Sequence, residues 1–409
     1  MSSRVTREAS MTTSNYSRLD RSELARLVPE LLLIGQLIDR AGMPWLLSFF
    51  DRQTMQDIAI EEWMAASPIY TRRMQHALGY TGTDVITIFK GLQLDIGAPP
   101  QFMDFRFAVT DPNHGEFWLD HCGALMDVEP MGEEYVRGMC HDIEDPTFDA
   151  TAVATNPKAQ VRPVHRPPRV PADQHPHCRW TVVIDESHPP VSESPGCVEV
   201  QKTTAANLVL PAIDPTDEGL SDYSGDLLSD LDFTAFSRSA LIRIADEVAL
   251  QSQLLALGFH LAVAQRADAT QTEKILGKQL IGIMGVAGER IGTALGMTDP
   301  IEIIALLPML NPAALIELTT DATGSGLTLD FGDLHGWGSL PAQWWADALA
   351  ASIHHLDPHL TVQPEGAGFR VVRLDEPTQK RSEVEVTQVS SGAGFAFESR
   401  LSLPIVQVT

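Results

Sequence analysis

The stretch Arg21-Ser22-Glu23-Leu24-Ala25-Arg26 is repeated 217 positions later as Arg238-Ser239-Ala240-Leu241-Ile242-Arg243. The residues that follow match at the same offset: Glu30 with Glu247, Leu33 with Leu250, Gln36 with Gln253, Arg73 with Arg290, and Ala77-Leu78-Gly79 with Ala294-Leu295-Gly296. After a slip of three residues, Phe117 matches Phe331 and His121 matches His335. Long self-similarity at a fixed offset is typical of a duplicated structural unit. The chain is therefore predicted to contain two related copies.

Both copies show the same order of hydrophobic patterns. In the first copy, helical periods cover 21–51, 51–78, 84–94 and 129–141, and strand-like runs cover 101–109, 116–119 and 178–184. The second copy predicts helices at 237–266, 272–295, 300–310 and 341–355, with strands at 315–321, 326–333 and 368–374. Helices that precede a small antiparallel sheet predict an α+β fold made of two pseudo-symmetric repeats.

Composition divides the chain into five parts. Residues 1–18 are polar and predicted to be disordered, 19–184 form the first repeat, and 185–228 form a linker rich in Pro, Ser, Asp and Gly. The second repeat, at 229–375, is degenerate because Gly336 follows His335 where Cys122 follows His121. Residues 376–409 form a C-terminal tail. Any chemistry is therefore expected in the first repeat.

The charge balance excludes some classes of partner. The chain carries 54 acidic and 29 basic residues, a formal net charge of −25, which argues against binding to nucleic acid or to an anionic membrane. Four cysteines are too few for a disulfide framework, and residues 1–18 have no apolar core of a signal peptide, so we expect a cytoplasmic protein. The expected ligand is a small molecule, and a homodimer is left open.

No nucleotide-cofactor motif is present. Gly282, Gly285, Gly288 and Gly292 lie inside a predicted helix rather than after a strand, so they predict close helix packing and not a phosphate cradle.

The candidate reactive residues are three cysteines in one region of the first repeat. Each is next to a histidine in the sequence. They are Cys122, Cys140 and Cys178, with His121 and His165 nearby in the sequence. Thiolate and imidazole together suit zinc or iron, so Cys122, Cys140, His165 and Cys178 form one candidate metal site, although no C-x-x-C pair is present. Alternatively Cys122 is a catalytic nucleophile, with His121 and His165 as further catalytic candidates. Because adjacent residues of a strand point to opposite faces, the activating base is expected to be His141, His165 or His177 rather than His121. Free cysteines also often only pack in a core.

A basic segment lies in the same region. Arg162, Arg166, Arg169 and Arg179 are concentrated there in an otherwise acidic chain, which suggests an anionic ligand; the alternative is that acidic residues of the same fold pair with them. Arg166, Arg169 and Trp180 are therefore candidate substrate-binding residues, although Trp180 also suits the core.

Residues 58–184 resemble the bacterial family of L-2-amino-thiazoline-4-carboxylate hydrolases. The matching segments are Glu61-Glu62-Trp63, Asp120-His121-Cys122, Gly132 through Cys140, Asn156-Pro157, Arg166-Pro167-Pro168 and His175-Pro176-His177-Cys178-Arg179-Trp180. The chain departs from the family at Arg166, where relatives often have cysteine, and at Cys122-Gly123, where relatives often have Cys-Pro. The resemblance implies a small-molecule active site at Cys122, Cys140 and Cys178 and hydrolysis of a C–N bond.

The favoured prediction is a hydrolase that opens a cyclic C–N bond in an anionic substrate. Two alternatives use the same residues. One is an iron-dependent oxidoreductase or lyase, and the other is a non-catalytic ligand-binding protein whose cysteines hold structural zinc.

Overall fold

The computed structural model describes residues 14–312, 315–321, 324–330, 336–366, 368–389 and 400–407, with only the backbone for the two ranges between 315 and 330. Residues Phe331 and His335, which the sequence comparison aligned with Phe117 and His121, lie outside the described residues.

Four long helices form the centre of the molecule. They are α1 (Arg21–Leu46), α2 (Arg52–Ala77), α8 (Arg238–Ala264) and α9 (Ala269–Leu295). Each helix is preceded by a residue whose short polar side chain accepts a hydrogen bond from the backbone N–H three residues later. These capping residues are Asp20, Asp51, Ser237 and Asp268. Pro68 lies inside α2, and the helix continues through it.

Shorter elements follow each pair of long helices. In the first half these are α3 (Val85–Leu92), β1 (Met103–Asp111), β2 (His114–Cys122), α4 (Gly123–Val128), α5 (Glu133–Arg137), α6 (Glu144–Val153), β3 (Ala159–His165) and β4 (Cys178–Ile184). In the second half they are α10 (Pro300–Leu306), β5 (Leu315–Asp321), β6 (Gly324–Asp330), α11 (Ala342–Ile353), β7 (Leu360–Glu365) and β8 (Gly368–Arg373), and the tail contains α12 (Ser382–Val389).

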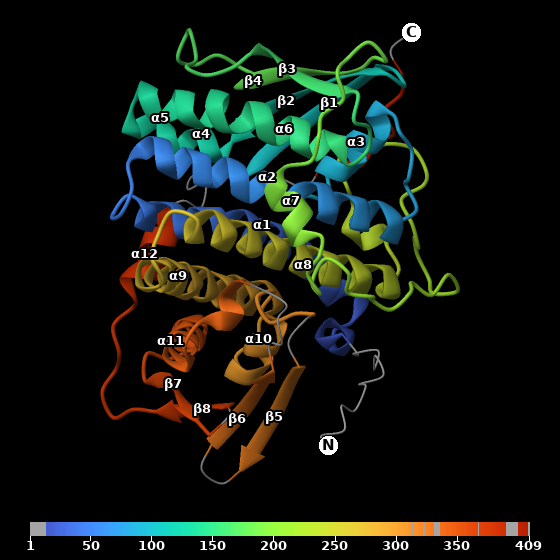
Figure 1. Cartoon of the computed structure of the whole chain (residues 1–409). Helices are drawn as coiled ribbons and strands as arrows, with labels where there is room; N and C mark the ends of the chain where they lie inside the picture. The colour runs from blue at the N-terminus through green and yellow to red at the C-terminus, as the bar shows by residue number, and fades with distance from the viewer. Residues whose placement is uncertain are drawn as a thin grey trace, which may run out of the picture.

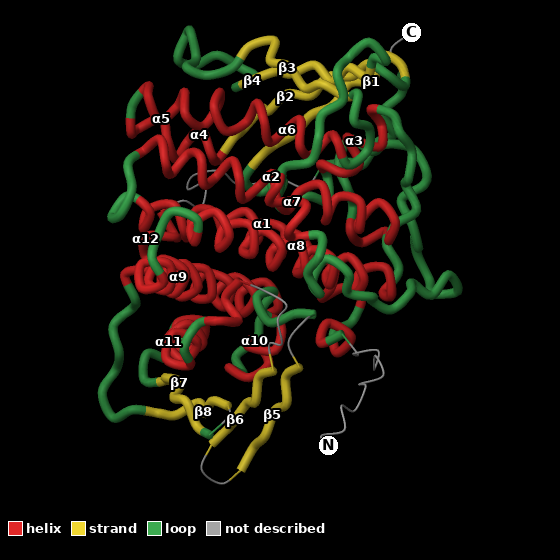
Figure 2. Tube along the Cα trace, viewed as in Figure 1, coloured by secondary structure: helices red, strands yellow, loops and turns green. Residues whose placement is uncertain are grey.

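The strands form two separate antiparallel sheets. Their orders are β1-β2-β4-β3 and β5-β6-β8-β7. The sheets lie at opposite ends of the molecule, with the helices stacked between them (Figures 1 and 2). Helices segregated from antiparallel sheets confirm the predicted α+β class.

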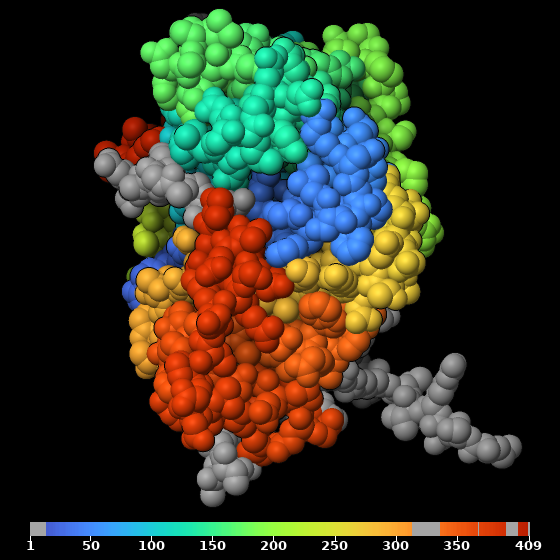
Figure 3. All heavy atoms as spheres, turned by 90° about the vertical axis from the view of Figure 1, so that its left-hand side faces the viewer, coloured from blue at the N-terminus to red at the C-terminus, as the bar shows by residue number. Residues whose placement is uncertain are grey.

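The two halves share one continuous hydrophobic core. Helix α1 packs against both α8 and α9, and α2 packs against α8, so each of the four long helices contacts a long helix of the other half. The second half and the tail lie directly against the first-half helices in Figure 3. Apolar surface that each half would expose alone is therefore buried by the other.

Two ion pairs cross between the halves at matching positions. Arg73 Nε lies 2.8 Å from Glu247 Oε2, and Arg290 Nε lies 2.6 Å from Glu30 Oε2. Both members of one pair are 217 positions from their counterparts in the other. Glu247 is the more deeply buried carboxylate, with 2% of its side chain exposed against 18% for Glu30.

The caps of α1 and α8 are linked in the same reciprocal way. Arg21 Nε donates to the carbonyl of Phe236 at 2.7 Å, and Arg238 Nε donates to the carbonyl of Leu19 at 2.9 Å. These bonds satisfy carbonyl groups that would otherwise be left without partners beside the helix starts.

Three expectations from the sequence differ from the structure. Residues Asn15–Arg18, inside the segment expected to be disordered, form a short 3-10 helix, because Tyr16 is fully buried and its hydroxyl donates to Leu306 O. The expected linker contains α7 (Pro195–Val200), which buries Cys197 against α2 and α8. The expected tail contains α12, which packs on α9.

The glycines of α9 are packing positions, as predicted. A Cβ atom on Gly288 would lie 1.9 Å from Ser352 O in α11, and one on Gly285 would lie 2.3 Å from the Val384 side chain in α12. Helices α11 and α12 therefore approach α9 more closely than a residue with a side chain at Gly288 or Gly285 would allow.

One described helix, α8, has the length and composition to cross a membrane, and 78% of its most apolar window is buried inside the protein. Helices α9 and α10 pass the same test only when taken together, and they are bent by 109°.

The inter-half ion pairs lead to a stability prediction. We expect Arg73→Ala to lower the free energy of unfolding by about 3 kcal/mol, because Glu247 would keep a buried charge with only Arg243 left as a partner. The control is Arg137→Ala, which removes an exposed pair with Glu133 and should cost less than about 0.5 kcal/mol. Urea unfolding followed by circular dichroism measures both, and equal losses would contradict the prediction.

Candidate functional site

The three first-half cysteines lie at element junctions. Cys122 ends β2 and caps α4, where its Sγ accepts a hydrogen bond from Leu125 N at 3.4 Å. Cys140 lies in a π-helical turn, Gly138–Ile143, between α5 and α6. Cys178 opens β4. All three are buried and free, and they lie close enough for the charge of Cys122 or Cys178 to raise the pKa of Cys140.

Burial keeps these thiols neutral. It raises the pKa of Cys122 to about 12, with Glu144 adding to the shift, and it raises the pKa values of Cys140 and Cys178 in the same direction. A neutral thiol is a weak nucleophile and a poor metal ligand. Among the described residues no group of three His, Cys, Asp or Glu side chains has a geometry that could hold a metal ion.

Among the described residues, the candidate histidines and the cysteines do not form one set of metal ligands. His165 ends β3, and its Nδ1 lies 3.3 Å from Gln174 Nε2. The His121 ring lies 6.1 Å from His177, which lies 4.9 Å from His175. Burial, with smaller contributions from Arg169 and the neighbouring histidines, lowers the pKa of His177 to about 4, so this imidazole is neutral near pH 7.

The four arginines that suggested an anionic ligand are paired within the fold. Arg162 binds Asp149, Arg166 binds Asp145, Arg169 binds Glu129 and Arg179 binds Glu116. Their charges are compensated, so this basic segment no longer requires an anionic ligand. Trp180, the third candidate substrate-binding residue, is fully buried between Phe117 and Phe148, with ring centroids 6.2 and 4.9 Å away.

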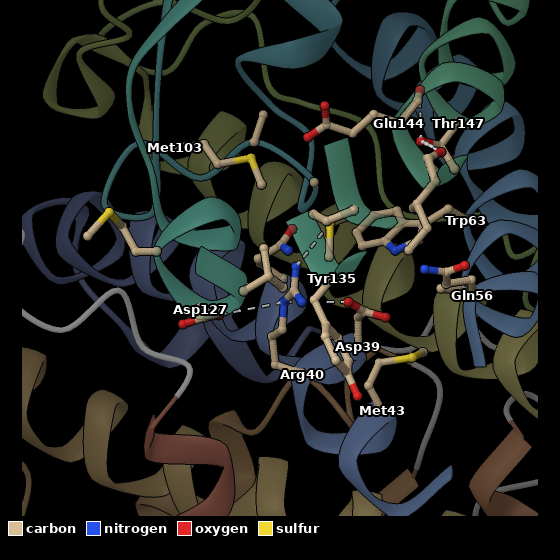
Figure 4. Close-up of a pocket in the computed structure, with 18 of the residues that line it drawn as sticks. Asp39, Arg40, Met43, Gln56, Trp63, Met103, Asp127, Tyr135, Glu144 and Thr147 are labelled. Atoms are coloured by element: carbon tan, nitrogen blue, oxygen red, sulfur yellow. Dashed lines mark hydrogen bonds and ion pairs between the residues drawn. The ribbon is translucent and has the colours of Figure 1, made fainter. Parts of the chain in front are cut away.

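A cavity of about 620 Å³ lies beside the cysteines, between the long helices and α4–α6. Its wall is mostly apolar, with six methionines and several aromatic rings: Met43, Met55, Met103, Met126, Met131, Met139, Trp63, Tyr70, Phe105, Tyr135 and Phe148. A volume of this size, with a few polar groups on an apolar wall, is typical of a small-molecule site. Figure 4 shows the polar groups that point into it.

Arg40 carries the positive charge of the cavity wall. Its Nε lies 3.6 Å from Asp39 Oδ2 and 3.9 Å from Asp127 Oδ2, as the dashed lines in Figure 4 mark. These separations are too long for hydrogen bonds, and its Nη2 faces the sulfur of Met139 at 3.8 Å. The guanidinium is therefore compensated in charge by two carboxylates, while Nε is buried without a hydrogen-bond acceptor among the described residues.

Asp39 and Glu62 form a buried carboxyl pair. Glu62 is fully buried, Asp39 is 3% exposed, and Asp39 Oδ1 and both Glu62 oxygens lack a hydrogen-bond donor among the described residues. Two carboxylates can be bonded only when one carries a proton. Burial, followed by the charge of Asp39, raises the pKa of Glu62 well above its usual range, so Glu62 is the protonated member.

Two further carboxyl groups at the cavity have pKa values near neutrality. Burial raises the pKa of Glu144 to about 8, and Arg166 opposes the shift. Its Oε2 is enclosed without a hydrogen-bond partner among the described residues. Burial raises the pKa of Asp95 to about 6, although Tyr70 and the Gly97 amide donate hydrogen bonds to it at 2.8 and 2.7 Å. Groups that titrate in this range can give and take protons at physiological pH.

Sequence reasoning missed all of these carboxyl groups. Asp39 and Arg40 directly follow the apolar run from Leu31 to Ile38, and a charged pair that continues a buried helical face was the available signal. Glu62 was quoted only as part of the family-like segment with Trp63.

No family model, curated protein or solved structure matches this chain.

The thiols should be inert in the folded protein. We expect none of the four cysteines to react with iodoacetamide within an hour at pH 8, and all four to react in 6 M guanidinium, because each is buried and its pKa is raised. Mass spectrometry counts the labels. Rapid labelling of Cys122 alone would contradict this and restore it as a candidate nucleophile.

The raised carboxyl pKa values predict a loss of stability with rising pH. Glu144 and Asp246 have folded-state pKa values of about 8 and 7, above their unfolded values, so the native state binds more protons and loses stability as pH rises through 7 and 8. We expect the melting temperature to fall between pH 6.5 and 8.5. Glu144→Gln should remove roughly 1–2 kcal/mol of that pH dependence, since one pKa unit is about 1.4 kcal/mol. An unchanged slope in Glu144→Gln would contradict the assignment.

Proposed function

We propose that the protein is a small-molecule enzyme whose reaction takes place in the first-half cavity. The observation that carries this proposal is the cavity of about 620 Å³. Its wall is mostly apolar and includes carboxyl groups that titrate near neutrality. Perturbed pKa values within a cavity of this size favour a reaction site over a purely structural void.

Hydrolysis of a cyclic C–N bond is the favoured reaction class. Glu144 would act in its ionised form as the general base. The water oxygen bonds to the ring carbon, the water proton passes to the Glu144 carboxylate, and the same proton passes on to the nitrogen as the C–N bond breaks. The reaction class is the one implied by the resemblance of residues 58–184 to the hydrolase family. The reactive group is the Glu144 carboxylate instead of the Cys122 thiol.

Cys122 has less support as the nucleophile, because its thiol is buried and neutral. A zinc or iron site of Cys122, Cys140, His165 and Cys178 would require these groups to deprotonate and rearrange, at a cost that metal binding would have to offset.

We also propose that the two halves are pseudo-symmetric repeats of one duplicated unit. The shared strand order and the reciprocal Arg73–Glu247 and Arg290–Glu30 pairs support this. The second repeat has no room for a counterpart of Cys122, since a Cβ atom on Gly336 would lie 2.8 Å from Ala256 O. It is best described as a scaffold for the first.

Filling the cavity tests the proposed site. Thr147 lines it from α6, and we expect Thr147→Trp to abolish binding of the neutral dye Nile red and of octanol as its competitor. The control, Glu134→Trp, adds the same side chain at an exposed position of α5 outside the cavity and should leave binding unchanged. Equal binding by both variants and the wild type would place the ligand elsewhere.

Turnover separates the two candidate catalysts. With 2-aminothiazoline, a cyclic amidine without a carboxylate, as the substrate, we expect Glu144→Gln to lower kcat by at least 100-fold and Cys122→Ser to lower it by less than fivefold. Melting temperatures of both variants control for folding. The opposite order would favour the thiol.

A further inference from the structure

Resting on the proposed function, the geometry points to a substrate class: we infer that the cavity selects a nitrogen cation, an amine or a protonated amidine, attached to an apolar body, with Asp39 and Glu62 as its charge partner. This inference differs from the anionic ligand that the arginine-rich segment suggested.

Negative groups outnumber positive ones on the cavity wall. Four carboxyl groups line it, namely Asp39, Asp95, Asp127 and Glu144, whereas Arg40 is the single cation among the described lining residues. Glu62 adds a fifth carboxyl group directly behind Asp39. A ligand anion would enter a site that already has an excess of carboxyl groups, whereas a cation would balance it.

Arg40 does not turn the cavity into an anion site. Asp39 and Asp127 lie on either side of its guanidinium, so the three groups together carry an excess of negative charge when both aspartates are ionised. A ligand carboxylate at Arg40 would have to approach these two like charges in a poorly solvated space, which is unfavourable.

Asp39 is the polar group best placed to receive a cation. It is almost fully buried on the cavity wall, and among the described residues its partners are the protonated Glu62 carboxyl and the Arg40 guanidinium at 3.6 Å. An ammonium or amidinium N–H would bring a full positive charge and a charge-assisted hydrogen bond to this buried carboxylate. Ionisation of Glu62 would then add a second acceptor beside it.

The rest of the wall suits the body of such a ligand. Trp63 follows Glu62 in α2 and lines the cavity, and aromatic faces attract cations. The methionines are flexible and polarizable, so they can pack against apolar groups of different shape. A cyclic amidine with a C–N bond open to hydrolysis belongs to this ligand class.

Binding of a cation should release protons. Glu62 and Glu144 carry protons near neutral pH, and the pKa values of Asp95 and Asp39 are also raised. The other charged or ionisable side chains among the described residues of the wall are Arg40, Asp127, Tyr70 and Tyr135. A cation favours the ionised carboxylates, so its affinity should rise between pH 6 and pH 8.5.

Three probes of equal length test the inference: octylamine, octanol and octanoate, each below its micelle concentration. Calorimetry at pH 7.5 should show octylamine binding at least tenfold more tightly than octanol, with octanoate weakest. Repeating the titration in buffers of different ionisation enthalpy should show a net release of protons with octylamine alone.

Variants locate the charge partner. Asp39→Asn should remove the preference for octylamine while changing octanol affinity less than twofold, and Glu62→Gln should weaken octylamine and remove the proton release. Asp142→Asn, at an exposed position outside the cavity, is the matched control and should behave as wild type.

Tighter binding of octanoate than of octylamine would overturn the inference and make Arg40 the ligand partner. Equal binding of the three probes would also overturn it, while leaving the cavity as a binding site. Failure of every probe to bind would reject the proposed site itself. The comparison on the wild-type protein needs no variant to fold.

Discussion

Burial of α1 on nearly every side is the constraint on which the rest of the structure depends. Residues 31–43 of this helix form an unbroken buried run, because α8 and α9 of the second half cover the faces that α2 and the cavity wall leave open. A helix buried all round is normally apolar all round. In α1 the apolar run ends in Asp39 and Arg40, which places two charges inside the core and requires partners for them.

The same burial has opposite consequences for the thiols and the carboxyl groups nearby. Removal from water disfavours the charged form of any acid. It therefore raises the pKa of a thiol so far that the thiol stays protonated at neutral pH. The same burial raises the pKa of a carboxyl group from the acidic range to near neutrality, where proton transfer is useful, as for Glu144. Near the cysteines it is therefore a carboxyl group, and not a thiol, whose pKa lies close to neutrality.

The sequence predicted what depends on local pattern and on internal comparison. The α+β class and the close packing of the α9 glycines follow from periodicity and spacing, and the structure confirms them. Helices predicted at 21–51 and 237–266 are present at 21–46 and 238–264. The protonation of Cys122, Cys140 and Cys178 depends on burial, which spacing does not reveal. The partners of Arg162 to Arg179 lie 13 to 63 positions away, so no local pattern shows that these charges are already paired. Asp39 and Glu62 lie on different helices, α1 and α2, which both pack against α8 of the second half, so their pairing depends on tertiary packing.

The glycines of α9 also mark positions where the two halves pack differently. Trp344 and Ser352 of α11 pack over Gly277 and Gly288, where a Cβ atom would lie 2.3 and 1.9 Å from them. The residues 217 positions earlier, in α2, are Ile60 and Thr71, whose side chains prevent an equally close approach. In the first half the connection between β2 and β3 is also longer, and it forms α4, α5 and α6 around the open space. At these two positions α11 packs closely on α9 in the second half, whereas the first half has larger side chains in α2 and a longer connection around the cavity of about 620 Å³.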